Sequence, residues 1–239
     1  MAGQANNPAR LAMGLHGLFP AAVVGAELRE PGDPSLLLPE EAACLGRAVP
    51  KRVQEFAAGR LCARRALAEF GVTDFPVRVA SDRQPLWPEF LVGSITHTDG
   101  YCAAVVAERR RLSAIGVDCE VMGRVTRELW PSIFGPEESR WLDSLAQSER
   151  VAAVTLLFAA KEAFYKCQYP LVGEWLNFHD LLVTPLERGA ASGTFTAVAT
   201  RPIALFARTP PAAHAASPVL GRFRFGEGLV SAGICLPAQ

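Results

Sequence analysis

Apolar positions in residues 151–166 recur at steps of three and four, which predicts an amphipathic helix with one buried stripe. Two charged residues fall on or beside this stripe, Lys161 four residues after Leu157 and Glu162 four residues after Phe158. A charge at a buried position needs a partner or a ligand, because isolated burial would drive it neutral. The ordinary alternative is a surface ion pair between Glu162 and Lys166, worth about 0.3 kcal/mol. The expected stripe consists of Val151, Val154, Leu157, Phe158 and Tyr165.

Residues 115–120 alternate with period two, which predicts a strand. One face is apolar and includes Cys119, so we expect this thiol in the core and not among any ligands. The other face carries Gly116, Asp118 and Glu120. Same-face residues are roughly 6.5–7 Å apart on a strand, so the two carboxylates can converge on one cation, which would remove their repulsion. Gly116 leaves room for a ligand or a close backbone approach. The alternative is an exposed strand face with no ligand.

The remaining pattern predicts helices over residues 39–70 and 137–145. A helix followed by three short strands occurs twice, without a clear sequence repeat. Residues 209–218 are rich in Pro and Ala and predict a loop. Residues 1–35 are poorly periodic, and we expect the first ten to be mobile. Short strands are expected near residues 75–80, 90–96, 101–108, 180–186, 193–200, 202–208 and 220–235.

The three unusual carboxylates, Asp118, Glu120 and Glu162, are hard oxygen donors, which suits Mg²⁺ or Mn²⁺. Magnesium held by few carboxylates completes its shell with water and substrate phosphate. Lys161, Lys166 and nearby arginines would then neutralise phosphate charge. The residues alone therefore indicate metal-assisted chemistry on a phosphate ester or anhydride.

Composition narrows the class of protein. The 239 residues allow one large or two small domains, and 50% are hydrophobic, enough for a sizeable core. A formal net charge of zero argues against binding nucleic acid or membranes through bulk charge. The six cysteines are scattered without a Cys-x-x-Cys pair, which indicates free thiols in a reducing compartment, so we expect a cytoplasmic protein. We expect no membrane span, because no apolar run reaches about 18 residues. We expect no signal peptide, because Gly14, His16, Gly17 and Pro20 interrupt the N-terminal apolar stretch.

Three segments together resemble one family. They are a Ser-Ile-Thr-His loop at 94–97, a Gly-Val-Asp-Cys-Glu strand at 116–120, and a Phe-Ala-Ala-Lys-Glu-Ala-Phe-Tyr-Lys helix at 158–166. In type, order and spacing, with 44 residues from Asp118 to Glu162, they are similar to the motifs of the 4'-phosphopantetheinyl transferases of the Sfp and EntD type. The resemblance runs from about Lys51 to His179 and returns weakly at 221–236, where we expect a closing pair of strands.

The resemblance implies a pseudo-twofold pair of similar α+β halves, residues 1–112 and 113–239, with coenzyme A in the cleft between them. It implies transfer of 4'-phosphopantetheine from coenzyme A to a serine hydroxyl of an apo acyl or peptidyl carrier protein, with release of adenosine 3',5'-bisphosphate. We expect a monomer that binds neither nucleic acid nor a membrane. No motif selects among fatty acid, polyketide and nonribosomal peptide carriers.

In such an enzyme Asp118, Glu120 and Glu162 would hold Mg²⁺, or Mn²⁺, on the coenzyme A pyrophosphate. Lys166 would contact a phosphate, and Lys161 would support Lys166 or pair with a carboxylate. The base that takes the proton of the carrier serine would be Glu162 or a water on the cation, and we favour the water. The catalytic residues expected are Glu162, Lys166 and His97.

The coenzyme A contacts come largely from the first half. Arg52 and Arg60 would grip the 3'-phosphate with their guanidinium forks, and His97 would donate to a phosphate oxygen. Where the family often has Gly-x-Pro, this chain has Arg83-Gln84-Pro85, so Arg83 replaces a glycine and could add a phosphate contact. The full set expected at coenzyme A is Arg52, Arg60, Arg83, Gln84, Pro85, Thr96, His97, Asp118, Lys161 and Lys166.

Two other classes of protein stay open. A metal-dependent phosphohydrolase of nucleotides or coenzyme A also needs carboxylates and lysines, but it would turn over without a protein acceptor. A non-catalytic coenzyme A-binding or partner-docking protein would leave the three carboxylates without a purpose.

Overall fold

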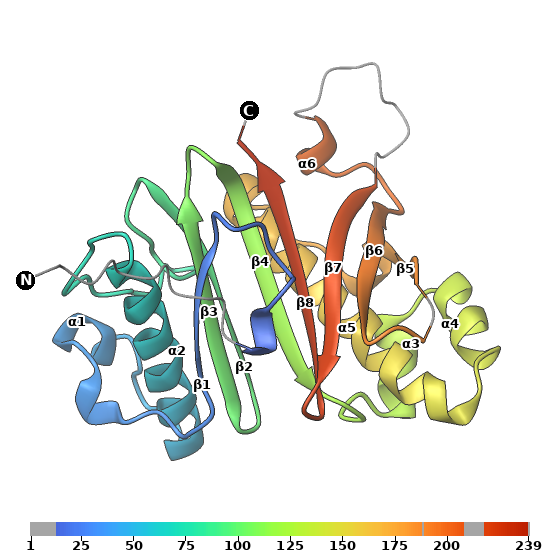
Figure 1. The fold of residues 1–239 in the computed structure, drawn as a ribbon, viewed down its shortest axis with the longest axis horizontal. Coiled ribbons are helices and arrows are strands. Elements are labelled where there is room, and N and C mark those ends of the chain that lie inside the picture. Colours follow the sequence, from blue (N-terminus) through green and yellow to red (C-terminus); the bar gives the residue numbers. More distant parts are fainter. Residues whose placement is uncertain (1–12, 188, 208–217, 239) are drawn as a thin grey trace, which may run out of the picture.

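Two antiparallel sheets lie side by side in the computed structural model, which describes residues 13–187, 189–207 and 218–238 (Figure 1). The first sheet has the order β1-β3-β2, with β1 at Val24–Leu28, β2 at Leu91–Thr98 and β3 at Tyr101–Glu108. The second has the order β4-β8-β7-β6-β5. Its strands are β4 (Leu112–Val121), β5 (Leu181–Pro185), β6 (Ser192–Ala199), β7 (Val219–Gly226) and β8 (Leu229–Pro237).

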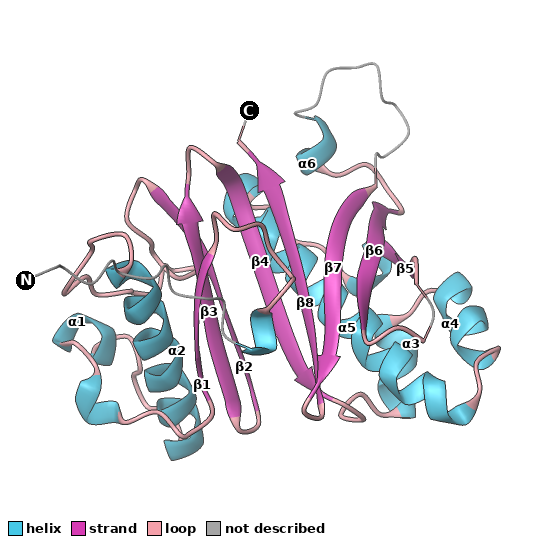
Figure 2. Ribbon diagram, viewed as in Figure 1, coloured by secondary structure: helices cyan, strands magenta, loops and turns pink. Residues whose placement is uncertain are grey.

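One long helix covers each sheet (Figure 2). Helix α2 (Pro50–Ala68) packs on the first sheet, and α5 (Gln147–Val172) packs on β4 and β8 of the second. This arrangement confirms the predicted α+β class. No helix among the described residues is long and apolar enough to cross a membrane. The shorter helices are α1 (Pro39–Ala42), α3 (Trp130–Ile133), α4 (Pro136–Asp143) and α6 (Ala204–Ala207), with 3₁₀ turns η1 (Met13–Leu15), η2 (Pro34–Leu36), η3 (Arg127–Leu129) and η4 (Phe178–Asp180).

The two sheets meet where β2 lies beside β4. Because β4 pairs with β8 along its other edge, its N–H groups facing β2 need partners from outside the ladder. Ser94 Oγ accepts from the Val117 N–H at 3.1 Å, and Thr96 Oγ1 accepts from the Cys119 N–H at 2.9 Å. Side-chain hydroxyls of β2 therefore replace a neighbouring strand's carbonyls and fix β2 against the motif strand.

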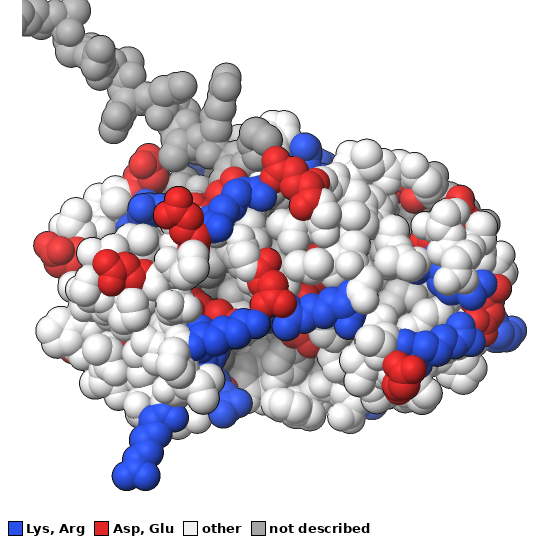
Figure 3. All heavy atoms as spheres, turned by 90° about the horizontal axis from the view of Figure 1, so that it is seen from below, with Lys and Arg blue, Asp and Glu red and all other residues white. Residues whose placement is uncertain are grey.

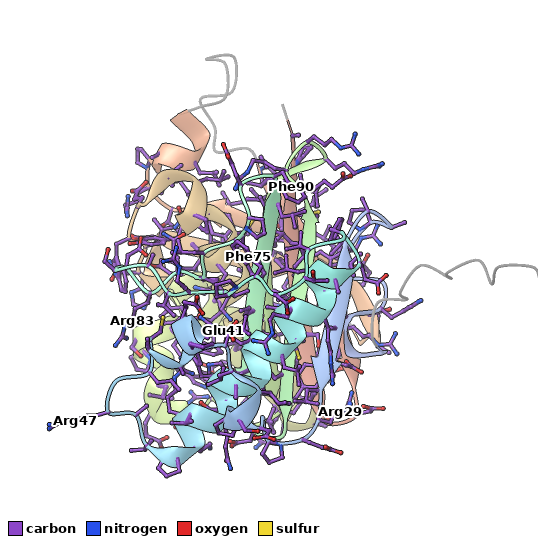
Figure 4. All side chains as sticks on the ribbon, turned by 90° about the vertical axis from the view of Figure 1, so that its left-hand side faces the viewer. Arg29, Glu41, Arg47, Phe75, Arg83 and Phe90 are labelled. Carbon is purple, nitrogen blue, oxygen red and sulfur yellow. The ribbon has the colours of Figure 1, made fainter. Side chains whose placement is uncertain are left out.

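A buried glutamate joins the elements of the first sheet. Glu41 is 0% exposed and forms an ion pair with Arg64 of α2. Its carboxylate also accepts from the backbone N–H of Val77 at 3.0 Å and of Leu38 at 3.0 Å, which caps α1. In Figure 4 its side chain lies inside the molecule between α1 and α2.

Glu138 repeats this arrangement beside the second sheet. It is 3% exposed, pairs with Lys161 of α5 at 2.7 Å, and accepts from the Val183 N–H at 3.0 Å and the Gly135 N–H at 3.1 Å. Each glutamate is thus the third residue of a Pro-Glu-Glu run that starts a short helix. Its carboxylate connects that short helix to a long helix and to an extended segment later in the chain. This short repeat, which the pattern analysis missed, supports the likeness of the two halves. The predicted boundary coincides with the start of β4, and the division into two domains stays a prediction.

Three predicted elements differ in the structure. The helix expected over 39–70 is two helices, because Pro50 starts α2 after a break. The strand expected at 75–80 is an extended loop with one isolated bridge, between Val79 and Pro85, since nearby prolines remove ladder donors. The strand expected at 202–208 is wrong: α6 occupies 204–207, and Glu174 Oε2 accepts from the Ala204 N–H at 2.6 Å.

Other elements were missed or misjudged. β1 lies in the N-terminal segment that shows little periodicity, and it was missed. The closing strand pair expected at 221–236 is confirmed as β7 and β8, which are joined at Glu227 and Gly228, with φ angles of +52° and +76°. Val154 and Leu157 are buried as expected, but Val151 is 44% exposed because it lies in the first turns of α5. The first ten residues, and all but Pro218 of the predicted 209–218 loop, lie outside the described residues.

Candidate active site

Asp118 lies where β2, β4 and α5 come together, and it is 4% exposed. Its Oδ1 accepts from Lys166 Nζ of α5 at 2.6 Å and from Thr96 Oγ1 of β2 at 3.1 Å. Its Oδ2 is buried and has no hydrogen-bond partner among the described residues. A buried carboxylate oxygen without a partner is costly, so this atom is ready for a ligand that can supply positive charge or a donor.

Glu120 and Glu162 share the electrostatic environment of Asp118. Burial, together with the negative charge of Asp118, raises the pKa of Glu120 to about 7. Burial also raises the pKa of Glu162 on α5, and Asp118 adds to that rise while Lys166 opposes it. Each carboxylate therefore responds to the charge of Asp118, as expected for groups brought to one region by β4 and α5.

Lys166 remains a cation at this site. Burial acts to lower the pKa of Lys166, but the neighbouring Asp118 carboxylate outweighs it and the pKa is raised. The predicted surface pair between Glu162 and Lys166 is therefore not the main contact of this ammonium group, which lies on Asp118.

The donor chemistry of the three carboxylates fits a hard divalent cation, because all are oxygen ligands and Asp118 Oδ2 has no partner within residues 13–187, 189–207 and 218–238. Their arrangement is not yet that of a metal shell: among the described residues, no three His, Cys, Asp or Glu side chains are grouped so that they could hold an ion. Instead, the Lys166 ammonium supplies the positive charge next to Asp118. The assignment of Asp118, Glu120 and Glu162 as metal ligands stays a prediction.

His97 lies on β2 beside the first turns of α2. Its Nε2 is 2.7 Å from Arg52 Nη1, and its Nδ1 is 3.8 Å from Glu55 Oε2. A guanidinium can only donate, so Nε2 accepts and the ring proton is on Nδ1. Burial, followed by the charge of Arg52, lowers the pKa of His97, so the imidazole is neutral at pH 7. The structure thus brings Arg52 and His97 together, with the ring proton on Nδ1. The phosphate contacts expected of both residues stay predictions.

A pocket opens next to this pair. Lys51, Glu55, His97 and Asp99 contribute to its lining, between α2 and the turn that joins β2 to β3. Figure 3 shows the molecule from below, where basic and acidic side chains alternate across the middle of the face. Lys51 Nζ pairs with Asp99 Oδ1 at 2.5 Å, and Arg124 Nη1, following β4, pairs with Asp99 Oδ2 at 3.1 Å. These contacts link the two sheets beside the predicted site.

Comparison with known proteins agrees with this arrangement. Residues 40–107 match a family model described as the 4'-phosphopantetheinyl transferase N-terminal domain, and residues 114–215 match that of the 4'-phosphopantetheinyl transferase superfamily. The chain belongs to the 4'-phosphopantetheinyl transferase superfamily. The resemblance based on three motifs, and the prediction of a transferase, are thereby confirmed.

Several relatives of this transferase are similar over about half to four-fifths of their length. The 4'-phosphopantetheinyl transferase Svp of Streptomyces mobaraensis is 39% identical over 221 residues, 87% of this chain and 82% of the relative. The 4'-phosphopantetheinyl transferase Npt of Nocardia iowensis is 38% identical over 185 residues, 74% of this chain and 81% of the relative. Enterobactin synthase component D of Escherichia coli (strain K12) is 38% identical over 118 residues, 48% of this chain and 54% of the relative.

Two basic residues expected at coenzyme A lie in the interior of this transferase. Lys161 is 3% exposed, and its ammonium donates to Glu138 Oε2 at 2.7 Å, Ile133 O at 3.0 Å and Phe178 O at 2.8 Å. All three of its hydrogens are used, so of the two predicted roles the structure has the pairing with a carboxylate.

Arg60 is 7% exposed; its Nε donates to Val77 O at 2.9 Å and its guanidinium lies 3.8 Å from the Phe56 ring centre. Burial lowers the pKa of Arg60 to about 10. These contacts serve packing in the first half, and a phosphate contact by Arg60 stays a prediction.

The Arg83-Gln84-Pro85 run closes a tight turn, and Arg83 has a φ of +73°. The Arg83 N–H donates to Ala80 O at 2.9 Å, and Gln84 Nε2 donates to Asp82 Oδ2 at 2.6 Å. A left-handed residue explains why a glycine is common here in the family, since glycine adopts this conformation at little cost. Arg83 lies at the edge of the molecule in Figure 4. A role for this turn at the adenine stays a prediction.

Thr98 and Arg124 were not predicted as site residues. Thr98 Oγ1 donates to Glu120 Oε2 at 3.2 Å, and Arg124 Nη1 donates to the same hydroxyl oxygen at 3.2 Å. The period of two along β2 could have indicated Thr98, because it shares a face with Thr96. Nothing in the local sequence distinguishes Arg124 from an ordinary surface arginine.

Proposed function

We propose that this transferase moves 4'-phosphopantetheine from coenzyme A to a serine hydroxyl of an apo acyl or peptidyl carrier protein, with Mg²⁺, releasing adenosine 3',5'-bisphosphate. The observation that carries the proposal is the environment of Asp118. Its Oδ1 accepts a hydrogen bond from Lys166, while its buried Oδ2 has no partner in the described part of the chain. Membership of the superfamily and the names of the relatives support the group that is transferred.

The metal ligands of this proposal are Asp118, Glu120 and Glu162. When bound there, Mg²⁺ would neutralise charge on the pyrophosphate and on the departing phosphate oxygen. The raised pKa values of Glu120 and Glu162 support this assignment, because carboxylates crowded in a buried site are stabilised by added positive charge.

The chain's own residues act on the phosphates and on the serine proton. Lys166 is charged and lies beside Asp118, so it can neutralise a phosphate oxygen. Arg52 and His97 would bind another phosphate of coenzyme A, with Nδ1 of His97 as donor, and the contact between the two side chains supports a shared role. The serine oxygen forms a bond to phosphorus as the bond to the adenosine bisphosphate breaks. The base that takes the serine proton would be Glu162 or a water held by the cation. The water is favoured, because a carboxylate bound to a cation would be a weaker base.

Intact-protein mass spectrometry tests the proposal. An apo carrier protein incubated with this transferase, coenzyme A and Mg²⁺ should gain one phosphopantetheine unit, and EDTA should abolish the gain. Glu162→Gln should lose the activity, whereas Glu89→Gln, the same change at an exposed position away from the site, should keep it. Hydrolysis of coenzyme A without any mass gain, on carriers of all three biosynthetic classes, would favour the phosphohydrolase class. Binding of coenzyme A with no turnover would favour a non-catalytic protein.

A further inference from the structure

Thr98 lies at the centre of a hydrogen-bonded chain that ends on Glu120. Its hydroxyl oxygen is 3.2 Å from Arg124 Nη1 and 3.2 Å from Glu120 Oε2. The same Arg124 nitrogen also pairs with Asp99 Oδ2 at 3.1 Å, and Asp99 pairs in turn with Lys51. Thr98 itself is 6% exposed, so its hydroxyl has little competition from solvent.

The direction of each hydrogen bond in this chain follows from the groups involved. A guanidinium has no acceptor, so the Thr98 oxygen must accept from Arg124. The single hydroxyl proton of Thr98 is then available for Glu120 Oε2. Threonine is β-branched and restricted at χ1, so the hydroxyl is held in place by the strand backbone. The chain therefore fixes one oxygen of Glu120, while Oε1 accepts no hydrogen bond from the described residues.

The neighbouring threonine makes a parallel contact with the other motif carboxylate. The backbone N–H of Cys119 can only donate, so Thr96 Oγ1 accepts from it at 2.9 Å and directs its own proton to Asp118 Oδ1 at 3.1 Å. Two threonines at a spacing of two on β2 thus face two carboxylates at a spacing of two on β4. The repetition indicates that β2 orients the acidic face of β4, and that the contact of Thr98 with Glu120 is part of that pattern.

We propose that Thr98 is a positioning residue for Glu120: with Arg124 as its donor, the hydroxyl holds Oε2 and leaves Oε1 for the divalent cation. The inference rests on the proposed function, because it concerns the cation of that reaction. Partners that orient metal ligands typically change metal affinity by about 10- to 100-fold when removed. Glu120 is one ligand of three, so we expect an effect of about tenfold.

The test uses Thr98→Val, which removes the hydroxyl and keeps the shape, and Thr98→Ser, which restores the hydroxyl. Thr196→Val is the control, since Thr196 also lies on a strand, β6, where it is half-buried. Among the described residues its hydroxyl donates one hydrogen bond, to Thr184 O. Two quantities are measured: Mn²⁺ binding to the protein by electron paramagnetic resonance, and the Mg²⁺ concentration that gives half the maximal transfer rate.

Thr98→Val should weaken Mn²⁺ binding and raise the half-maximal Mg²⁺ concentration by about tenfold, with kcat at saturating Mg²⁺ at the wild-type level. Thr98→Ser should restore both quantities, and Thr196→Val should match wild type. Arg124→Met should shift both in the same direction by a smaller amount, because Thr98 keeps its proton for Glu120. This second variant decides the matter if Thr98→Val fails to fold, since the Arg124 side chain is 48% exposed.

Unchanged Mn²⁺ binding and Mg²⁺ dependence in a folded Thr98→Val protein would overturn the inference and leave the proposed function standing. A lower kcat or a lower melting temperature, with metal dependence unchanged, would show a merely structural role and would also overturn it. Wild-type protein that binds no Mn²⁺, and transfers phosphopantetheine in EDTA, would instead overturn the metal role in the proposed function.

Discussion

Substitution of Gly116 by alanine should separate the two elements that carry the candidate active site. A Cβ atom built on Gly116 would lie 2.0 Å from Ala163 O, 2.7 Å from Cys167 N and 2.9 Å from Cys167 Cβ. Two of these atoms are backbone atoms of α5, so no side-chain rotation can relieve the contact. The predicted alternatives for Gly116 were a ligand or a close backbone approach, and the structure has the close approach.

The size of the effect follows from these distances. Ordinary contact begins at 3.4 Å, so the Ala163 carbonyl, 2.0 Å away, must move by about 1.4 Å (3.4 − 2.0). Ala163 follows Glu162 and Cys167 follows Lys166, so the movement shifts both functional side chains relative to Asp118. Overpacking a core lowers the free energy of unfolding by about 1–3 kcal/mol. We expect about 3 kcal/mol here, because the atoms in the way belong to the backbone and cannot rotate aside. For a chain of this size that lowers the melting temperature by about 6–12 °C.

The transfer activity of Gly116→Ala should fall by more than the loss of folded protein accounts for. A displacement of about 1 Å at a catalytic group can cost about 10²-fold, so we expect kcat/KM of the folded Gly116→Ala protein to fall by about that factor. Gly226→Ala is the control, because its Cβ would have only one neighbour, Arg224 Nε at 3.8 Å. Calorimetry and a steady-state transfer assay, both below the melting transition, measure the two effects. Wild-type stability and activity in Gly116→Ala would refute the close contact between β4 and α5.

Four further predictions concern single side chains. Lys161→Met should destabilise the fold by about 3–5 kcal/mol in urea unfolding, because it leaves Glu138 buried and unpaired. The double variant Lys161→Met/Glu138→Gln should lose less stability than the sum of the losses in the two single variants. Arg83→Gly should raise stability by about 1 kcal/mol by relieving a left-handed residue, and a lower urea midpoint would contradict this. Cys119→Val should leave folding and transfer nearly unchanged, and a folded but inactive variant would contradict its placement in the core. Burial lowers the pKa of His97 in the folded state, so the unfolded state binds more protons below about pH 6.5. The free energy of unfolding should therefore fall as the pH drops from about 6.5 through the folded-state pKa. His97→Gln should reduce this pH dependence in unfolding experiments.

Alternation along β4 was readable because it depends only on neighbouring residues. It predicted correctly that Cys119 is buried, with 0% exposure, and that Asp118 faces away from it toward α5. The helical period likewise predicted that a charge at Lys161 needs a partner. It could not name Glu138, because that residue comes from a different helix, 23 positions earlier in the chain.

Contacts that depend on tertiary placement were beyond the local pattern. Nothing in the local sequence indicates that Arg60 is buried, yet its Nε donates to the Val77 carbonyl in the interior. Arg124 reads as a surface arginine, yet the adjacency of β2 and β4 brings it to Thr98. Arg83 is the exception, since a residue in place of a family glycine already suggests a left-handed backbone position.

The central claim is tested most directly by quantifying the holo-carrier protein and adenosine 3',5'-bisphosphate from the same reaction. The account predicts equal amounts of the two products, with neither formed in the absence of apo carrier, in EDTA, or with Asp118→Asn. Release of nucleotide without a carrier, or holo-carrier formation by Asp118→Asn at the wild-type rate, would contradict the account.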